Sequence, residues 1–368
     1  MAMRLLSGLR VVEVSATPKA GFCGKMFVDA GAEVIKMGLP GIPRHGSLSP
    51  WLDRGKSSVV VDWRLPEGMA LVERLLDAVD VLVSDADDEE GADELSEAAT
   101  RFSRLVRVSV TDLGVRGPFA GRPATDLVVS ALSGMSYING MAGRTPLREP
   151  GNQTAIVAGI AAYLGALAAL VNREVTSQGQ AVEVSALEAM VNVLSPQILQ
   201  WSYQQRSPDR RGSAEGFLFD CADGKVSLMT YRQLSWDTIV ALWGIELTAE
   251  QAERFSTEQG RNQNMAELRS VLAPALRTKT RQEIFEEICS LRIPCGMVLT
   301  PGELPTDPHL SERQSFDSFG GDGRSGRLFP APAFRTAGER PGAERELPGL
   351  GEQTVSLLPA VPNQEESA

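Results

Sequence analysis

Asp126 is the side chain in this sequence that is best placed to do chemistry. It follows the segment Gly121-Arg122-Pro123-Ala124-Thr125 and begins an apolar stretch that is typical of a helix. A carboxylate there could act as a nucleophile. It could also be a simple helix N-cap that accepts hydrogen bonds from free backbone N–H groups. Taken alone, the residue type and its position favour the cap, so a catalytic role needs further support.

Other familiar catalytic patterns are missing. A dinucleotide-binding fingerprint would place glycines at a set spacing after the first strand. The two glycines of the segment from Thr17 to Gly24 do not match this spacing. A nicotinamide or flavin enzyme is therefore disfavoured. The sequence has no Gly-x-Ser-x-Gly elbow, and neither His45 nor His309 is near a candidate nucleophile in sequence, which disfavours a hydrolase.

Charge and composition narrow the choice of partners. The formal net charge of −11 would repel a polyphosphate backbone, so we expect no nucleic acid partner. The four cysteines fall in no metal-ligand pattern, and with two histidines a metal site is not expected. Free thiols fit a cytoplasmic protein.

The uncharged run from Ala155 to Val171 is at the lower limit of membrane-spanning length, but its Ala and Gly content favours an internal helix rather than a membrane span.

The first 110 residues alternate short β-branched runs with helical patterns, which is typical of a parallel sheet with crossover helices. A helix is predicted to begin at Pro66-Glu67, because proline and an acid are favoured in the first helical turn. We therefore expect a Rossmann-like half. Its predicted strands are Leu9 to Val14, Val34 to Lys36, Val59 to Asp62, Val81 to Val83 and Leu105 to Val110.

The remaining chain predicts a second domain and an irregular tail. Apolar helical stretches cover 126–135, 155–171 and 186–199, with a strand-like segment at 179–184 between the last two. The polar segment 204–214 is typical of a linker. A hairpin is expected to turn at Ala222-Asp223-Gly224, with three helical patterns after it up to Arg292. From Asp317 onward the sequence is rich in Gly, Pro and Arg and predicts extended chain.

Several blocks along the chain, taken in order, resemble the class III coenzyme A transferase family, which also contains carnitine dehydratase and methylacyl-CoA racemase. One block contains Asp126, and another is similar to the family's "D-x-G-A-x-V-I-K" segment. The matching blocks are Leu6 to Val14, Asp29 to Lys36, Asp53 to Ser58, Leu65 to Gly68, Gly114 to Pro118, Arg122 to Asp126, Ser133 to Met135, Gly179 to Ser185 with Glu188-Ala189, Asp307-Pro308-His309 with Arg313, and Pro348 to Glu352 with Thr354.

The resemblance implies a fold and a partner. The expected fold is α/β: a large Rossmann-like domain with a parallel sheet over residues 1–200, a smaller α+β domain over 213–305, and a segment over 306–368 that returns to the large domain. The family implies an interlocked homodimer in which each subunit is a ring threaded by the other.

The resemblance also implies a reaction. In these transferases an aspartate attacks an acyl-CoA thioester, and coenzyme A is later passed to a small carboxylic acid. Asp126 would take that role, and coenzyme A would be bound as a substrate thioester, with no metal. Matching the family pattern gives as candidate CoA-binding residues Thr17, Pro18, Lys19, Arg54, Lys56, Val61, Arg64 and Ser84.

Two other functions remain open. Racemases of this family carry histidine directly before the aspartate, whereas this chain has Thr125, which cannot serve as a base near neutral pH. An epimerase, racemase or lyase-like reaction on the same scaffold is thus a weaker alternative. The family's "E-N-F-R" segment, which touches CoA, is replaced by Ser84-Asp85-Ala86-Asp87, and acids there would repel phosphates. This change favours a third interpretation, a non-catalytic subunit that pairs with an active paralogue.

Overall fold

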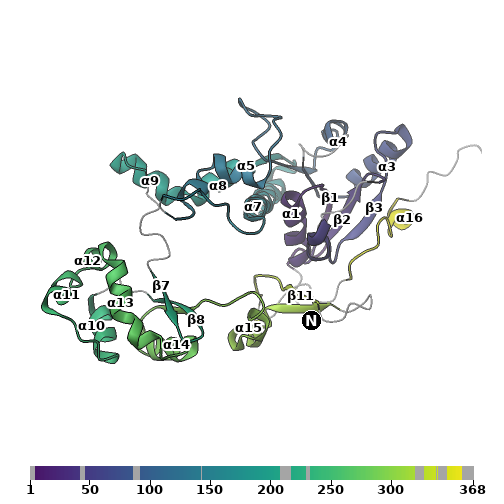
Figure 1. Ribbon diagram of the computed structural model, residues 1–368. Coiled ribbons are helices and arrows are strands. Elements are labelled where there is room, and N and C mark those ends of the chain that lie inside the picture. Colours follow the sequence, from purple (N-terminus) through teal and green to yellow (C-terminus); the bar gives the residue numbers. More distant parts are fainter. Residues whose placement is uncertain are drawn as a thin grey trace, which may run out of the picture. The chain divides into compact units, whose positions relative to one another are not determined.

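The chain forms two compact units in the computed structural model (Figure 1). The larger unit comprises residues 1–139, 146–208 and 314–368, and the smaller comprises 140–145 and 209–313. The structure describes residues 5–41, 46–85, 92–141, 143–207, 217–228, 233–319, 327–336, 338 and 346–358.

The larger unit is built on a six-stranded sheet in the order β3-β2-β1-β4-β5-β6, in which every neighbouring pair is parallel. This is the strand order of a Rossmann fold, so the predicted α/β class is confirmed. The five strands predicted from β-branched runs all form, and the strand-like segment at 179–184 adds the sixth at the edge. The strands are β1 (Arg10–Val14), β2 (Glu33–Gly38), β3 (Ser57–Val60), β4 (Val81–Ser84), β5 (Val106–Thr111) and β6 (Ala181–Ser185).

Helices cover both faces of this sheet, because successive strand residues point to opposite sides. Val11 belongs to the core beneath α1 and α7, whereas Val12 belongs to the core beneath α3 and α4. Helix α3 begins at Pro66, as the sequence predicts. The helices of the unit are α1 (Pro18–Asp29), α2 (Ser49–Leu52), α3 (Pro66–Asp77), α4 (Ala92–Ala99), α5 (Asp126–Leu132), α6 (Met135–Ile138), α7 (Gln153–Thr176), α8 (Ala186–Val193), α9 (Ser195–Gln204) and α16 (Thr354–Leu357).

Two of the predicted helical stretches are interrupted in the structure. The stretch at 126–135 is divided into α5 and α6 by Gly134, whose positive φ of 88° ends one helix and starts the other. The stretch at 186–199 is divided into α8 and α9, where Pro196 lies in the first turn of α9. Apolar periodicity alone did not reveal either break.

Helix α7 is long and apolar enough to cross a membrane, judged by length and composition alone. Core helices of globular proteins pass the same test. In this structure Ala158, Ala162 and Ala166 are fully buried in the core beside α1. Gly159 allows the closest approach, since a Cβ there would lie 2.8 Å from the carbonyl oxygen of Lys19. The small residues of the run thus serve helix packing.

The C-terminal segment is less irregular than its composition predicts. β10 (Phe316–Phe319) pairs antiparallel with β11 (Arg327–Pro330). Further on, the chain runs beside β3, the edge strand of the sheet. The Gln353 side chain accepts a 2.7 Å hydrogen bond from Ser58 N, and the Gln353 backbone N–H donates to Ser58 O at 3.0 Å. Thr354 Oγ1 accepts from Val60 N at 3.0 Å. These bonds satisfy an otherwise open sheet edge.

The smaller unit packs helices on a three-stranded antiparallel sheet in the order β7-β8-β9. The predicted hairpin forms, with Cys221 opposite Gly224. Strand β9 was not predicted, and the three expected helical patterns are five helices among the described residues between 233 and 290. The elements are β7 (Leu218–Cys221), β8 (Gly224–Leu228), α10 (Gln233–Leu242), α11 (Ala249–Arg254), α12 (Glu258–Gln263), α13 (Met265–Leu276), α14 (Arg281–Ser290), β9 (Cys295–Met297) and α15 (Pro308–Glu312).

Candidate active site

The sheet of the larger unit reverses its strand order between β1 and β4. Ligands of open α/β sheets bind outside the carboxyl ends of the strands at such a point. Val14 and Ser84 end these two strands and are paired in register. The structure therefore places four of the predicted CoA-binding residues at this switch point: Thr17, Pro18 and Lys19 at the start of α1, and Ser84 at the end of β4.

Asp85 ties the two switch-point loops together. One oxygen of its carboxylate accepts hydrogen bonds from Thr17 N at 2.7 Å and Thr17 Oγ1 at 2.9 Å, and the other accepts from Ala20 N at 3.0 Å. The side chain is fully buried, and burial raises its pKa to about 7, although Lys19 and the hydrogen bonds from Thr17 and Ala20 act in the opposite direction. An internal carboxyl group thus occupies the N-terminus of α1, where Rossmann proteins bind a phosphate.

Lys19 lies in the first turn of α1, and its side chain is almost completely buried. Its Nζ is 2.9 Å from Oδ1 of Asp112, which follows β5. The ion pair connects the switch point to the next loop at the same edge of the sheet. As the structure stands, the charge of Lys19 is compensated within the chain.

Lys56 belongs to a buried charge cluster beneath α1. Its Nζ lies 2.5 Å from Glu13 Oε2 and 3.6 Å from Asp53 Oδ1, and it donates a 3.0 Å hydrogen bond to Gly21 O. Lys36 also pairs with Asp53, at 2.9 Å, and burial lowers the pKa of Lys36. A phosphate could reach this buried cation only after both carboxylate partners had moved, so we expect Lys56 to have a structural role.

The remaining predicted CoA-binding residues lie at opposite ends of β3. Arg54 precedes the strand and pairs with Asp317 at 3.0 Å. Val61 and Arg64 follow the strand. Val61 is buried in the core, whereas the Arg64 side chain is 38% exposed and its Nε lies 2.8 Å from Asp62 Oδ1. The structure does not bring these side chains together with Lys19 into one described cavity.

Asp126 begins α5, and the extended Thr125 is the N-cap residue of this helix. The carboxylate is not fully buried, since 15% of its side chain is exposed. One oxygen accepts a hydrogen bond from the Thr154 hydroxyl in the first turn of α7, and the other lies 3.6 Å from the guanidinium of Arg148. The loop before α7 and its first turn therefore orient the carboxylate.

A second carboxylate, that of Glu149, contacts α5 one helical turn after Asp126. Ser130 follows Asp126 by four residues, so the two share one face of the helix. The Ser130 hydroxyl donates to Glu149 Oε2 at 2.6 Å and lies 2.7 Å from the Ser136 hydroxyl. Glu149 is buried. The segment 148–154 therefore contacts the same α5 face through Arg148, Glu149 and Thr154.

Packing of α7 brings this region towards the switch point. Gly159 touches Lys19, and Thr154 lies five residues earlier on the same helix, which corresponds to about 7.5 Å along its axis. Asp126 and the loop after β1 consequently lie at the same end of the α1–α7 pair. Thr154 and Asp85 were not singled out as site residues from the sequence. Their roles depend on partners 28 and 68 residues away.

Some residues discussed from the sequence lie outside the described part of the chain. These are His45, the acidic run at 87–90 and the linker beyond Ser207. His309 lies in α15 of the smaller unit.

Comparisons with known proteins support the family resemblance. The model of CoA-transferase family III matches residues 6–354. The chain belongs to this family. Among curated relatives, a succinyl-CoA–D-citramalate CoA-transferase of Chloroflexus aurantiacus is 29% identical over 337 residues, covering 85% of this chain and 83% of the relative. A subunit of the succinyl-CoA:(R)-benzylsuccinate CoA-transferase of Thauera aromatica is 26% identical, covering 96% of this chain and 93% of the relative.

Solved structures agree on the fold. A CaiB/BaiF family protein of Brucella suis superimposes with a TM-score of 0.84 at 23% identity, covering 97% of this chain and 99% of that one. Family membership and these relatives support a transferase of coenzyme A in general terms. Among the described residues, no three His, Cys, Asp or Glu side chains are grouped in a way that could bind a metal.

The buried Asp85 predicts a pH dependence of stability. Its pKa is raised in the folded state from 3.8 to about 7, so the folded protein retains a proton that the unfolded chain releases. The contribution of this group to the free energy of unfolding should therefore fall as the pH rises from about 4 to about 7. Urea denaturation of the wild type and Asp85→Asn across this range measures it. As the pH rises, the free energy of unfolding of the wild type should fall relative to that of Asp85→Asn. A rise relative to Asp85→Asn contradicts the prediction.

Lys56→Met tests whether Lys56 is structural. Loss of the ammonium leaves Glu13 and Asp53 buried with less compensating charge, which should lower the free energy of unfolding by about 3–5 kcal/mol. The matched control, Arg64→Met, removes an exposed cation and should change stability by about 0.5 kcal/mol or less. Denaturant unfolding measures both. Unchanged stability of Lys56→Met would rule out the structural role.

Proposed function

We propose that this protein transfers coenzyme A between an acyl-CoA and a small carboxylic acid, with Asp126 as the nucleophile. The observation that carries the proposal is the partly exposed Asp126 carboxylate, which is oriented by Thr154 and Arg148 at the same end of the α1–α7 pair as the switch point. The two relatives described above are named for succinyl-CoA and for a second dicarboxylic acid. We infer that this chain also uses a small organic acid as acceptor.

The reaction would begin with attack of an Asp126 oxygen on the thioester carbonyl carbon. The carbon–sulfur bond breaks, CoA leaves as a thiolate, and a mixed anhydride remains on Asp126. The acceptor carboxylate then displaces the donor acid from this anhydride. Attack of the thiolate on the new anhydride releases the second acyl-CoA and restores the Asp126 carboxylate. No external base is needed, because every nucleophile in the sequence is already an anion.

Two groups beside Asp126 would assist these steps. The Thr154 hydroxyl holds one oxygen and so directs the other towards the substrate. Arg148 is 46% exposed, and its positive charge can stabilise the oxyanion that develops on the thioester carbonyl. The free N–H groups in the first turn of α5 could contribute to the same stabilisation.

A second candidate is a non-catalytic subunit that functions beside an active paralogue. Two observations favour it: Lys19 and Lys56 are buried in internal ion pairs, and Asp85 occupies the N-terminus of α1. A CoA phosphate would have to compete with these carboxylates. The relative from Thauera aromatica is named as a subunit of its enzyme.

Trapping of the anhydride distinguishes these functions. After incubation with succinyl-CoA and hydroxylamine, peptide mass spectrometry should find the hydroxamate at Asp126, and Asp126→Asn should abolish both trapping and transfer. Asp112→Asn is a control that removes another carboxylate near the switch point. A transfer-active protein whose hydroxamate forms at another carboxylate contradicts the role of Asp126. If calorimetry detects no CoA binding and a related chain co-purifies, the non-catalytic subunit is supported. If deuterium enters at the α-carbon of the acyl group without trapping at Asp126, an epimerase is supported.

We also propose that two copies of the chain form an interlocked dimer. A stripe on α7, formed by Ile160, Leu164, Val171 and Val175, is apolar and exposed, and Val175 reaches 85% exposure. Leu199 and Trp201 on α9 are also more than half exposed. Apolar surfaces of this kind mark interaction sites in soluble proteins. A partner subunit covering them would explain why these helices are hydrophobic on their outer faces.

Subunit exchange tests the threaded arrangement. Light scattering should give twice the mass of one chain. Because threaded rings cannot separate while folded, mixing two differently tagged preparations should give no mixed dimers in native buffer. Mixed dimers should appear after unfolding and refolding the two together, which serves as the positive control. A monomeric mass, or exchange without denaturant, would contradict the proposal.

A further inference from the structure

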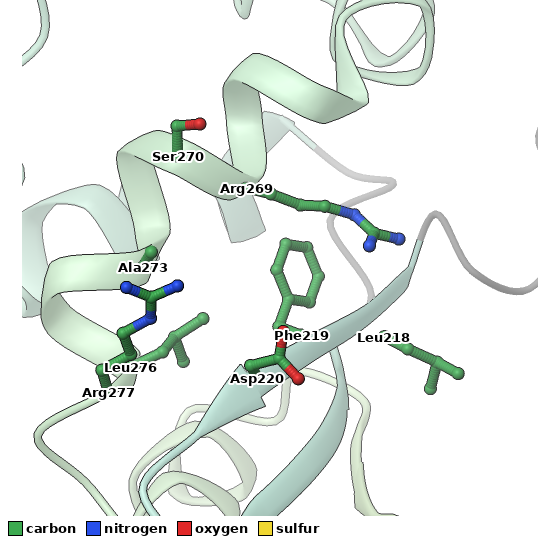
Figure 2. A pocket seen from close by; sticks show the side chains of 8 residues that line it. All are labelled: Leu218, Phe219, Asp220, Arg269, Ser270, Ala273, Leu276 and Arg277. Carbon is green, nitrogen blue, oxygen red and sulfur yellow. The ribbon is translucent and has the colours of Figure 1, made fainter.

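A cavity of about 140 Å³ lies between α13 and β7 in the smaller unit (Figure 2). Phe219 and Leu276 are buried and form an apolar floor. The cavity is formed within this unit and does not involve Asp126 or the switch point. Its lining residues are Leu218, Phe219, Asp220, Arg269, Ser270, Ala273, Leu276 and Arg277.

Two arginines dominate the charge of this cavity. Arg269 and Arg277 are eight residues apart, so their backbone positions are separated by about 12 Å along the axis of α13 and its end. In Figure 2 their guanidinium groups lie on either side of Phe219. Within the described part of the chain, no carboxylate lies at ion-pair distance from either guanidinium. In an acidic protein, such a pair of arginines provides a local site for anions.

Asp220 is the one acid that lines the cavity, and its charge is already compensated. It forms an ion pair with Lys225, which lies opposite it in the β7–β8 hairpin. The hydrogen bond from Lys225 is the main reason that the pKa of Asp220 lies below its usual range, and Arg277 and Arg269 lower this pKa further from a distance. Asp220 and Lys225 together are neutral, so the cavity retains the positive charge of its two arginines.

We propose that this cavity binds a small aliphatic dicarboxylate, with one carboxylate on each guanidinium and the carbon chain over Phe219. Planar guanidinium groups bind carboxylates through paired hydrogen bonds, and the apolar floor suits methylene groups. The volume corresponds to about five water molecules, which suits a diacid of four or five carbons and is too small for coenzyme A. A single phosphate would engage only one of the two separated cations.

Arginine modification provides a readout at this site alone. The full-length protein is treated with phenylglyoxal in the presence of succinate, and peptide mass spectrometry measures the modification of Arg269 and Arg277. Succinate should protect both arginines, whereas butyrate, a monocarboxylate of similar length, should protect neither to a comparable degree. Arg206 is exposed in the larger unit and serves as an internal reference whose modification should not change.

Calorimetric titration with succinate tests the two contacts separately. Arg269→Gln and Arg277→Gln should each weaken binding at this site by about tenfold or more, because each removes a charge-assisted pair of hydrogen bonds. Arg206→Gln is the matched control and should bind as the wild type does. Circular dichroism establishes that each variant is folded. Because Asp126→Asn should leave this binding intact, failure of the transferase proposal and failure of this one are distinguishable.

Three results would overturn the proposal. They are equal protection by succinate and butyrate, protection by inorganic phosphate but not by succinate, and unchanged succinate affinity in both arginine variants. The second result would identify a phosphate site instead.

Discussion

The close contact between α1 and α7 at Gly159 determines the arrangement of the larger unit. No side chain separates the two helices there, and the position of a Cβ at residue 159 would overlap the backbone of Lys19 and the side chain of Phe22. This contact places the second turn of α7 against the first turns of α1. Thr154 orients Asp126 from one helix, and Thr17 and Lys19 belong to the other. Residues more than 100 positions apart in sequence thus share one end of the sheet.

Charge compensation is the second constraint on the site. The protein is acidic overall, yet its larger unit buries Lys19, Lys36 and Lys56, each paired with a carboxylate. Buried ion pairs are costly to break, since removal of one partner leaves an isolated charge. Cations of this kind fix the positions of the loops after β1, before β3 and after β5. A phosphate approaching the switch point also meets Asp85, which already accepts the free N–H groups of α1.

The fold was predicted well where the pattern is local. β-branched runs gave the first five strands, and Pro66-Glu67 gave the start of α3. Prediction failed where a single residue interrupts a regular pattern, as at Gly134 and Pro196. It also failed at β9, whose three residues carry too little periodicity to be recognised. The tail at 346–358 has no periodicity of its own from which its position could be predicted. Hydrogen bonds to the edge strand β3 hold it in place.

The sequence by itself determined the family and the α/β class, because blocks of matching residues and strand-forming runs are properties of the linear chain. It also drew attention to Asp126 and to the loops after the first and fourth strands. Only the tertiary structure decided that Lys56 is enclosed between Glu13 and Asp53, that Asp85 fills the start of α1, and that Thr154 holds Asp126. Each of these contacts joins residues far apart in sequence. Burial and distance, which set the charge and reach of such groups, arise only when the chain is folded.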